Sequence, residues 1–432
     1  MGPLERAVVV ENPDPALDEL LESHGIQAHR LAEAPDEDGL IEVLQSTRAH
    51  VLFKRSRVPV SRKVVESCPD LFAVQLCCIG DDSVDKEACA DNGVLVFNDP
   101  VSNGRSVVEM AIAHLIALSR RLYETDSSCR AGVWEKNNIE RYEVKGKVLG
   151  VIGLGNIGRQ VARAADALGM QVRFFDSRYA AVEVGIEFGW DAATDVEELM
   201  RTSDFVSVHL SATDSGGQSN EGIITAARLM MLGADRPDSS PRIFLNLSRG
   251  FLHAPGDLLA AIDAGVVRRA AVDVYPKEPR GGESWQNPYA GSTKVIVSPH
   301  IGAATQEAQP RIARRVARTL GQFSRLGNVR DTVFAPRSQL GLAESAGQGK
   351  VLLAVVHSTA RGTKRAVDDA IYQAGASNLS SVHKDFVMYG AAYDLASIDR
   401  PLSEQEVRGL VDEAARVTGD PHAIRSVRQI VV

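Results

Sequence analysis

The sequence lacks the features that mark secreted, membrane-spanning and nucleic-acid-binding proteins. Its 432 residues include five cysteines with no paired CxxC spacing, and an odd number of unpatterned thiols suits a reducing compartment. No run approaches the roughly 20 apolar residues of a membrane span. The net charge of −8 gives no long-range attraction to nucleic acid or to an anionic membrane. We therefore predict a cytoplasmic protein without nucleic-acid or membrane partners, in which a local positive cluster holds any anionic ligand.

Hydrophobic residues make up 44% of the chain, enough for sizeable cores in two or three domains. Short apolar runs such as AVVVEN, VLFKRSR and VLVFND alternate with amphipathic stretches, which is typical of βα units and a mostly parallel sheet. A second βα series starts at KVLGVIGLGNIG and continues through DFVSVHL, RIFLNLSRG and KVIVSPH. The pattern predicts two tandem doubly wound α/β domains, Rossmann-like and flavodoxin-like.

The end of the chain has a different organisation. Residues 331–349 gain Gly, Ser and Pro and lose periodicity, so we expect a linker there. The segment 350–432 then reads as β, α, β, β, α, β, a small α+β domain. Ser403 and Glu406 have the spacing of a capping box at its second helix. The histidines lack metal-ligand spacing, so no metal site is predicted.

One motif has the context that dinucleotide binding requires. Gly153, Gly155 and Gly158 form GxGxxG directly after the apolar strand KVLGVI and before an alanine-rich helix. These positions serve a tight turn, close approach to a pyrophosphate, and helix–strand packing. Asp176 ends the next strand, where a carboxylate can accept hydrogen bonds from the adenosine ribose. Asp176 favours NAD over NADP, and Arg178 two residues later leaves strict discrimination open.

Three polar residues follow strand-like runs, where open α/β sheets bind their ligands. They are Arg249 after FLNLS, Glu278 in AAVDVYPKEP, and His300 after KVIVSP. Each could alone be a solvated turn residue, a surface ion-pair partner or a hydrogen-bonded spacer. Together, downstream of a dinucleotide fingerprint, they match hydride transfer. Such a reaction needs a cation for a carboxylate, an imidazole for the proton, and a carboxylate that holds the imidazole.

The motifs GLGNIG, NLSRG, DVYPKEP and SPHIG resemble those of the D-isomer-specific 2-hydroxyacid dehydrogenases. KRSRV, CCIGDDSVD, FNDPVSNGRSVVE, GVWEK and HIGAATQEAQ are similar to the D-3-phosphoglycerate dehydrogenase branch of that family. The resemblance implies a discontinuous substrate-binding domain at 1–101 and 301–330 and an NAD-binding domain at 102–300. Beyond the linker, residues 350–432 resemble a regulatory ACT domain.

The resemblance implies NAD-dependent oxidation of 3-phospho-D-glycerate to 3-phosphooxypyruvate, the first step of L-serine biosynthesis. Arg249 would bind the substrate carboxylate, and His300 would exchange the hydroxyl proton. Glu278 would hydrogen-bond the imidazole and raise its pKa. Two alternatives stay open. One is reduction of another 2-oxo acid, such as hydroxypyruvate, glyoxylate or 2-oxoglutarate, and the other is an NAD-responsive binding protein of the same fold.

Further coenzyme contacts follow from the same resemblance. Asp273 takes the place of a carboxylate near the nicotinamide carboxamide, and Asn156 and Ile157 would offer backbone contacts to the pyrophosphate. The residues expected to border the nicotinamide are Leu247, Ser248, Arg249, His300, Ile301, Gly302 and Ala303.

A phosphorylated substrate requires a separate cationic cluster. Arg55 and Arg57 flank Ser56 in FKRSRV, and donors of this kind can surround a phosphate. Alternation along a strand would place both arginines on one face, opposite Ser56 unless the backbone turns. A solvated basic turn is the alternative. By family match, the predicted substrate residues are Arg55, Ser56, Gly80 and Asn103.

The C-terminal segment departs from the pattern expected of a serine-binding regulatory domain. His357 and Asn378 fit effector positions, but Thr359 stands where an Asn is expected, and its hydroxyl has half the hydrogen-bonding groups of an amide. Serine inhibition and a role in assembly alone are both open.

Trp134 in GVWEK resembles a subunit contact, so we expect a homo-oligomer, either a dimer or a tetramer.

Overall fold

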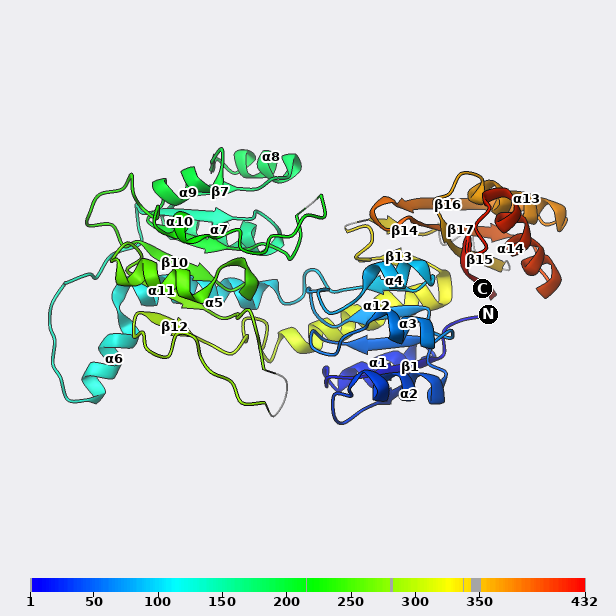
Figure 1. The fold of residues 1–432 in the computed structure, drawn as a ribbon, viewed down its shortest axis with the longest axis horizontal. Helices are drawn as coiled ribbons and strands as arrows, with labels where there is room; N and C mark the ends of the chain where they lie inside the picture. The colour runs from blue at the N-terminus through cyan, green and yellow to red at the C-terminus, as the bar shows by residue number, and fades with distance from the viewer. Residues whose placement is uncertain (1, 215, 280–282, 337, 343–350, 432) are drawn as a thin grey trace. The chain divides into compact units, whose positions relative to one another are not determined.

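The computed structural model describes residues 2–214, 216–279, 283–336, 338–342 and 351–431. The chain divides into two compact units (Figure 1). One combines Met1–Ser102 with Gln309–Val432, and the other is Asn103–Ala308. Residues 337 and 343–349 of the predicted linker lie outside the described residues.

The first sheet has five parallel strands in the order β2-β1-β3-β4-β5, the flavodoxin-like order. Its strands are β1 (Arg6–Val9), β2 (Gln27–Arg30), β3 (Val51–Lys54), β4 (Ala73–Leu76) and β5 (Leu95–Phe97). The intervening helices are α1 (Ala16–Ser23), α2 (Glu37–Thr47), α3 (Arg62–Ser67) and α4 (Lys86–Asp91). Every residue of β3 and β4 is buried, which explains why their sequences are apolar without alternation.

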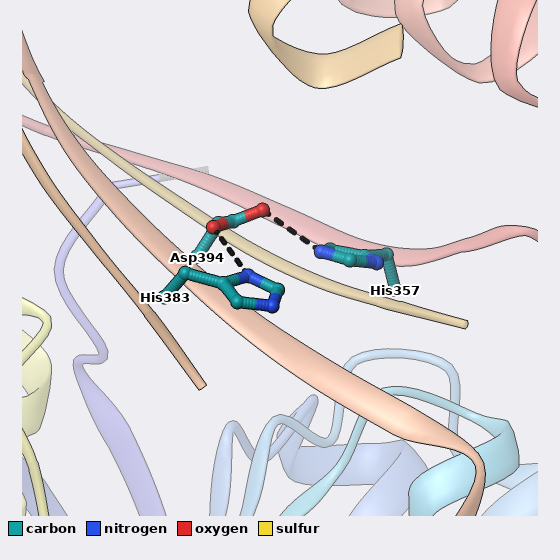
Figure 2. Close-up of side chains that lie close together, drawn as sticks. All are labelled: His357, His383 and Asp394. Atoms are coloured by element: carbon teal, nitrogen blue, oxygen red, sulfur yellow. Dashed lines mark hydrogen bonds and ion pairs between the residues drawn. The ribbon is translucent and has the colours of Figure 1, made fainter. Parts of the chain in front are cut away.

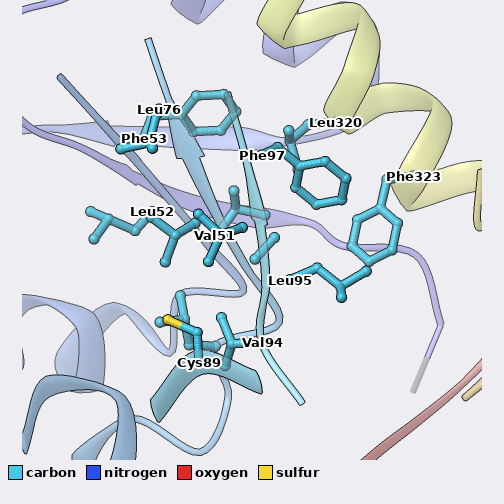
Figure 3. Packing of buried hydrophobic residues seen from close by; sticks show 14 of the residues in the cluster. Val51, Leu52, Phe53, Leu76, Cys89, Val94, Leu95, Phe97, Leu320 and Phe323 are labelled. Atoms are coloured by element: carbon cyan, nitrogen blue, oxygen red, sulfur yellow. The ribbon is translucent and has the colours of Figure 1, made fainter. Parts of the chain in front are cut away.

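A helix from much later in the sequence completes this core. Helix α12 (Ala308–Leu326) brings Leu320 and Phe323 against the residues of β5 (Figure 3). The rings of Phe97 and Phe323 lie 5.0 Å apart, within the range of favourable aromatic pairs. The first unit therefore depends on two segments separated by more than two hundred residues of sequence.

The second sheet has seven parallel strands in the order β12-β11-β10-β9-β6-β7-β8, which contains the Rossmann order with one added strand. Its strands are β6 (Val148–Ile152), β7 (Gln171–Phe175), β8 (Asp191–Ala192), β9 (Phe205–Val208), β10 (Ile243–Asn246), β11 (Arg269–Val272) and β12 (Val295–Val297). Its α-helices are α5 (Gly104–Arg120), α6 (Leu122–Arg130), α7 (Asn156–Ala167), α8 (Tyr179–Glu187), α9 (Val196–Thr202), α10 (Ala226–Leu229) and α11 (Pro255–Asp263). Among the described residues, no helix has both the length and the apolar character that a membrane crossing requires.

The C-terminal sheet is antiparallel, with strand order β16-β17-β15-β18. Its elements run β15 (Val351–Ser358), α13 (Thr363–Gln373), β16 (Asn378–Phe386), β17 (Ala391–Ile398), α14 (Glu404–Thr418) and β18 (Ile424–Val431). A hairpin of β13 (Val329–Arg330) and β14 (Gln339–Leu340) precedes them. The predicted α/β fold with a small C-terminal α+β part is confirmed, as is the capping box of Ser403 and Glu406.

Buried polar side chains join the C-terminal sheet to the rest of its unit. The guanidinium of Arg428 donates to the carbonyl of Phe323 at 2.7 Å and lies 4.2 Å from the centre of that ring. The Tyr393 hydroxyl donates to the carbonyl of Gly327. Burial lowers the pKa of Arg428 to about 10. The C-terminal sheet therefore shares a core with α12.

Candidate active site

The turn between β6 and α7 requires glycine at two of its positions. Gly153 has φ of +92°, and a Cβ there would lie 2.5 Å from the carbonyl oxygen of His209. A Cβ on Gly158 would lie 2.0 Å from the carbonyl oxygen of Gly153, so a side chain would separate helix from strand. At Gly155 the nearest atom to a Cβ would be 3.9 Å away. Space remains beside Gly155, at the N-terminus of α7, where backbone N–H groups can receive a pyrophosphate.

Asp176 follows β7, and both of its carboxylate oxygens accept hydrogen bonds from the protein. Its Oδ2 accepts from the backbone N–H of Leu154 at 2.8 Å and from Nη2 of Arg178 at 2.6 Å. Its Oδ1 accepts from the backbone N–H and Nε of Arg178, both at 2.9 Å. Although burial acts in the opposite direction, these bonds hold the pKa of Asp176 below its usual range. A ribose hydroxyl can bind Asp176 only if the Arg178 side chain releases it, because a carboxylate has about four acceptor positions.

His300 and Glu278 form a direct pair. The Nδ1 of His300 lies 2.9 Å from Oε1 and 2.8 Å from Oε2 of Glu278, and both side chains are partly exposed. The hydrogen bond with Glu278 raises the pKa of His300, against the opposing effect of burial. Although burial raises it, the bond with His300 holds the pKa of Glu278 below its usual range. Because Nδ1 faces the carboxylate, Nε2 is the ring atom left to exchange a proton.

The turn that carries His300 is organised by Asp273. The buried Asp273 carboxylate accepts from the Ser298 hydroxyl at 2.5 Å, from the Ile301 backbone N–H at 3.0 Å and from the Gly302 backbone N–H at 2.8 Å. His300 itself has φ of +54°, a left-handed conformation that is uncommon outside glycine. Asp273, expected beside the nicotinamide, thus binds the Ser298 side chain before His300 and the backbone of Ile301 and Gly302 after it.

Arg249 follows β10, and a buried asparagine shapes its loop. The Asn246 side chain donates to the carbonyl of Arg249 at 2.9 Å and accepts from the backbone N–H and the hydroxyl of Ser248. Leu247 is buried, and Nη1 of Arg249 donates to the carbonyl of Ser248. After the bond with His300, the charge of Arg249 also contributes to lowering the pKa of Glu278.

The remaining predicted coenzyme residues lie in two stretches of the second unit, one beside Gly155 and one after His300. Asn156 and Ile157 form the first turn of α7, next to Gly155. Ile301 and Ala303 flank the buried Gly302 in the turn after His300.

The predicted phosphate residues lie on a loop that a buried acid anchors. Strand β3 ends at Lys54, so the arginines lie past the strand and its alternation does not apply to them. The carboxylate of Glu11, at the end of β1, accepts from the backbone N–H groups of Arg55 and Arg57, both at 2.6 Å, and of Val58 at 3.1 Å. Arg57 also lies 3.8 Å from this carboxylate through Nε. Across residues 2–214, 216–279, 283–336, 338–342 and 351–431, no ion pair involves Arg55.

The other predicted substrate and effector residues lie on separate elements. Gly80 follows β4, the strand beside β3, whereas Asn103 is in the other unit, at the N-terminus of α5. His357 is paired with Ala392 near the start of β17, whereas Asn378 is paired with Ile398 at its end. A single chain therefore does not bring His357 and Asn378 together.

Sequence reasoning missed three residues that support these loops: Glu11, Asn246 and Ser298. Each is a polar residue at or just after the end of an apolar strand run. The same signal that identified Arg249 and His300 was therefore present for them.

The model of the "D-isomer specific 2-hydroxyacid dehydrogenase, NAD binding domain" matches residues 112–302. D-3-phosphoglycerate dehydrogenase of Haemophilus influenzae is 33% identical over 322 residues, which cover 74% of this chain and 74% of the relative. The Escherichia coli K12 protein of that name is 34% identical over 313 residues, 72% of each chain. D-3-phosphoglycerate dehydrogenase 1 of Saccharomyces cerevisiae is 29% identical over 404 residues, and the alignment covers 91% of this chain and 82% of the yeast protein.

Solved structures agree on the fold. A glyoxylate reductase from Paecilomyes thermophila superposes with a TM-score of 0.66 at 23% identity, covering 77% of this chain and 98% of its own. An acyclic imino acid reductase in complex with NADPH and D-Arg gives a TM-score of 0.62 at 22% identity, covering 73% of this chain and 96% of its own. At such identities the likeness concerns architecture alone.

Proposed function

The chain belongs to the D-isomer-specific 2-hydroxyacid dehydrogenase family, and from that premise we propose that it oxidises 3-phospho-D-glycerate to 3-phosphooxypyruvate. It is an NAD-dependent enzyme that acts on a small 2-hydroxy acid. The relatives named D-3-phosphoglycerate dehydrogenase, at about 30% identity over most of the chain, support the phosphorylated substrate and hence the first step of L-serine biosynthesis.

In the proposed reaction His300 handles the proton. Oxidation removes the C2 hydrogen as hydride and the hydroxyl hydrogen as a proton, and Nε2 of His300 accepts that proton. Glu278 holds the opposite nitrogen, so it fixes the ring and stabilises the imidazolium that forms. The Arg249 guanidinium binds the substrate carboxylate and polarises the C2 oxygen, for which a planar, bidentate donor is suited.

The second unit fits NAD at several points. Glycines that tolerate no Cβ form the turn after β6, and open space lies beside Gly155. NAD supplies the nicotinamide that accepts the hydride. The protein's part is to hold the pyrophosphate on the N–H groups of α7 and to keep the turn around His300 rigid through Asp273.

The anchored loop after β3 is the observation that carries the phosphate assignment. The Glu11 side chain is fully buried, and it uses both oxygens on backbone N–H groups of the loop. A solvated basic turn has no need of a buried charge beneath it, because burying a carboxylate is costly unless it is hydrogen-bonded. The anchor fixes the backbone from which Arg55 and Ser56 project, so less side-chain and loop ordering is needed when a phosphate binds.

Replacing Arg55 with alanine is expected to lower kcat/KM for phosphooxypyruvate about 10- to 100-fold, the range for loss of a charge-assisted hydrogen bond. Hydroxypyruvate lacks the phosphate, so its kcat/KM is expected to change about twofold or less. Steady-state NADH oxidation with both substrates measures the two values.

Arg62→Ala is the matched control, since Arg62 is an exposed arginine seven residues away that pairs with Glu66 and Asp91 on the surface. It is expected to leave both substrates unaffected. Equal losses on both substrates in Arg55→Ala, or a wild-type enzyme with no preference for the phosphorylated substrate, would exclude the phosphate role and leave another 2-hydroxy acid as the substrate.

We also propose a homo-oligomer that uses the segment between α6 and β6. Trp134 is 83% exposed there, and Val133 and Ile139 are exposed beside it in sequence. Apolar side chains gathered on one surface segment are typical of a contact with another chain. Trp134→Glu is expected to lower the molar mass measured by light scattering, whereas Tyr179→Glu, at an exposed aromatic on α8, is not. An unchanged mass in both variants would contradict an interface at Trp134.

A further inference from the structure

Three side chains of the C-terminal sheet bring their ligand atoms together. The Asp394 carboxylate lies between two imidazole rings (Figure 2). Its Oδ2 is 2.8 Å from Nε2 of His357, and its Oδ1 is 2.9 Å from Nδ1 of His383. All the facing ligand atoms lie within 4.8 Å of one another. The catalytic proposal above uses none of these residues.

Strand pairing explains why the three meet. Asp394 is on the central strand β17, directly opposite His383 on β16. On the other side β17 pairs with β15, where Asp394 faces Val355 and His357 faces Ala392. His357 is therefore the diagonal neighbour of Asp394 on the same face of the sheet. All three side chains project from paired strands, which hold ligand geometry more rigidly than loops do.

The hydrogen-bond partners around each ring limit where its protons can lie. Nδ1 of His357 is 2.7 Å from the backbone carbonyl of Ser358, which can only accept, so Nδ1 carries a hydrogen. His383 lies between two carboxylates, with Nδ1 2.9 Å from Oδ1 of Asp394 and Nε2 3.1 Å from an oxygen of Asp385. In the neutral forms, His357 points the lone pair of Nε2 at Asp394, and His383 can donate to only one of its two carboxylates. Each neutral ring therefore leaves a nitrogen lone pair facing a carboxylate, an arrangement that one bound cation shared by the three side chains would relieve.

Metal sites have this arrangement of partners. Histidines that bind a metal nearly always donate their other ring N–H to a carbonyl or carboxylate. Nδ1 of His357 has such a partner in the Ser358 carbonyl, and Nε2 of His383 has one in Asp385. Two imidazole nitrogens and one carboxylate oxygen are the ligand types zinc prefers, and three protein ligands leave a fourth position open. Ligand atoms about 2.05 Å from a tetrahedral zinc lie about 3.3 Å apart. The two nitrogen–oxygen pairs, at 2.8 and 2.9 Å, would separate by about half an ångström, and the three ligand atoms already lie within 4.8 Å of one another.

We propose that His357, His383 and Asp394 bind a divalent transition-metal ion, Zn²⁺ in particular, with one coordination position left for water or a small anion. His357 and Asp394 are buried, while the His383 side chain is 33% exposed and leaves a path for the ion. One cation competes: Nζ of Lys364, on α13, lies 3.7 Å from Oδ1 of Asp394. Lys364 also pairs with Asp368 at 2.6 Å, so it has another partner when the ion binds.

The test is Zn²⁺ binding to the 432-residue chain after treatment with a chelator, measured by isothermal titration calorimetry. The wild type is expected to bind one ion per chain in a saturable manner. His383→Ala is expected to weaken binding about 100-fold or more, since loss of a direct ligand exceeds the 10- to 100-fold effect of losing an outer-shell partner. Lys364→Met is expected to tighten it, because it removes the competing charge.

His422→Ala is the matched control, because His422 is an exposed histidine in the same part of the chain. It is expected to bind like the wild type. Co²⁺ serves as a second probe, since its visible absorption distinguishes nitrogen and oxygen ligands from the thiolate of the exposed Cys129. Absence of saturable binding, or equal binding by His383→Ala and the wild type, would overturn the proposal.

Discussion

His300→Ala is expected to lower kcat about 10²- to 10⁴-fold, the usual contribution of a positioned acid or base. NADH binding is expected to stay within a few-fold of the wild type, because the proposed pyrophosphate contacts at the glycine turn after β6 do not involve the imidazole. Steady-state kinetics measures the first effect, and quenching of protein fluorescence by NADH measures the second. A normal turnover would remove His300 from the proton path.

Glu278→Gln separates the chemical role of the pair from its structure, since the amide fills the same space without the charge. In the proposed mechanism, reduction of the 2-oxo acid needs the imidazolium, so its rate is expected to hold at low pH and to fall as pH rises through the raised pKa of His300. Without the Glu278 charge, the main cause of that increase is lost, and the fall is expected at lower pH. Oxidation needs the neutral ring, so its rate rises with pH. In the variant this rise is also expected at lower pH. An unchanged pH profile would contradict the coupling.

Asp176→Ala is expected to change the coenzyme preference. Removing the carboxylate loses the proposed acceptor for the ribose hydroxyls and releases Arg178, whose guanidinium can then bind a 2′-phosphate. We expect kcat/KM for NAD⁺ to fall about 10- to 100-fold, as for the loss of hydrogen bonds to a charged group. The value for NADP⁺ is expected to rise. Initial rates with both coenzymes measure the change in their ratio.

Arg178→Ala is the companion variant. It keeps the carboxylate and frees the acceptor positions that Arg178 occupies, so NAD⁺ preference is expected to be kept or strengthened. The Asp176→Asn variant retains an oxygen for the Leu154 N–H and thereby controls for collapse of the glycine turn. If Asp176→Ala leaves the ratio of kcat/KM for NAD⁺ to kcat/KM for NADP⁺ unchanged, Asp176 does not contribute to coenzyme selection.

Sequence predicted the α/β architecture and the coenzyme turn because both depend on local rules. The apolar runs that became β3, β4 and β6 are continuous because parallel strands are buried on both faces. The glycine positions report backbone conformations and close contacts that other residues cannot adopt. Periodicity is less informative where a left-handed residue interrupts a helix. The stretch SVVEMAIAHLIALSRRLYE has apolar residues at helical spacing, but Arg121, with φ of +54°, divides it into α5 and α6.

Residue roles that depend on distant partners could not be read from the chain. Asp273 was expected at the nicotinamide, and the structure shows both its oxygens bound to the turn around His300, twenty-five or more residues later. Glu11 could not be linked to the loop at Arg55, because the contact spans 44 residues.

The sequence by itself determined the family, the fold class and the types of residue available for hydride transfer, since motifs of this kind are short and locally constrained. Only the tertiary structure decided which oxygens and nitrogens face one another. The cluster of His357, His383 and Asp394 shows the reason: the spacing of these residues in sequence suggests no metal site, but antiparallel pairing of three strands brings their ligand atoms within 4.8 Å. Strand register, which long-range packing sets, is what converts separate side chains into a site.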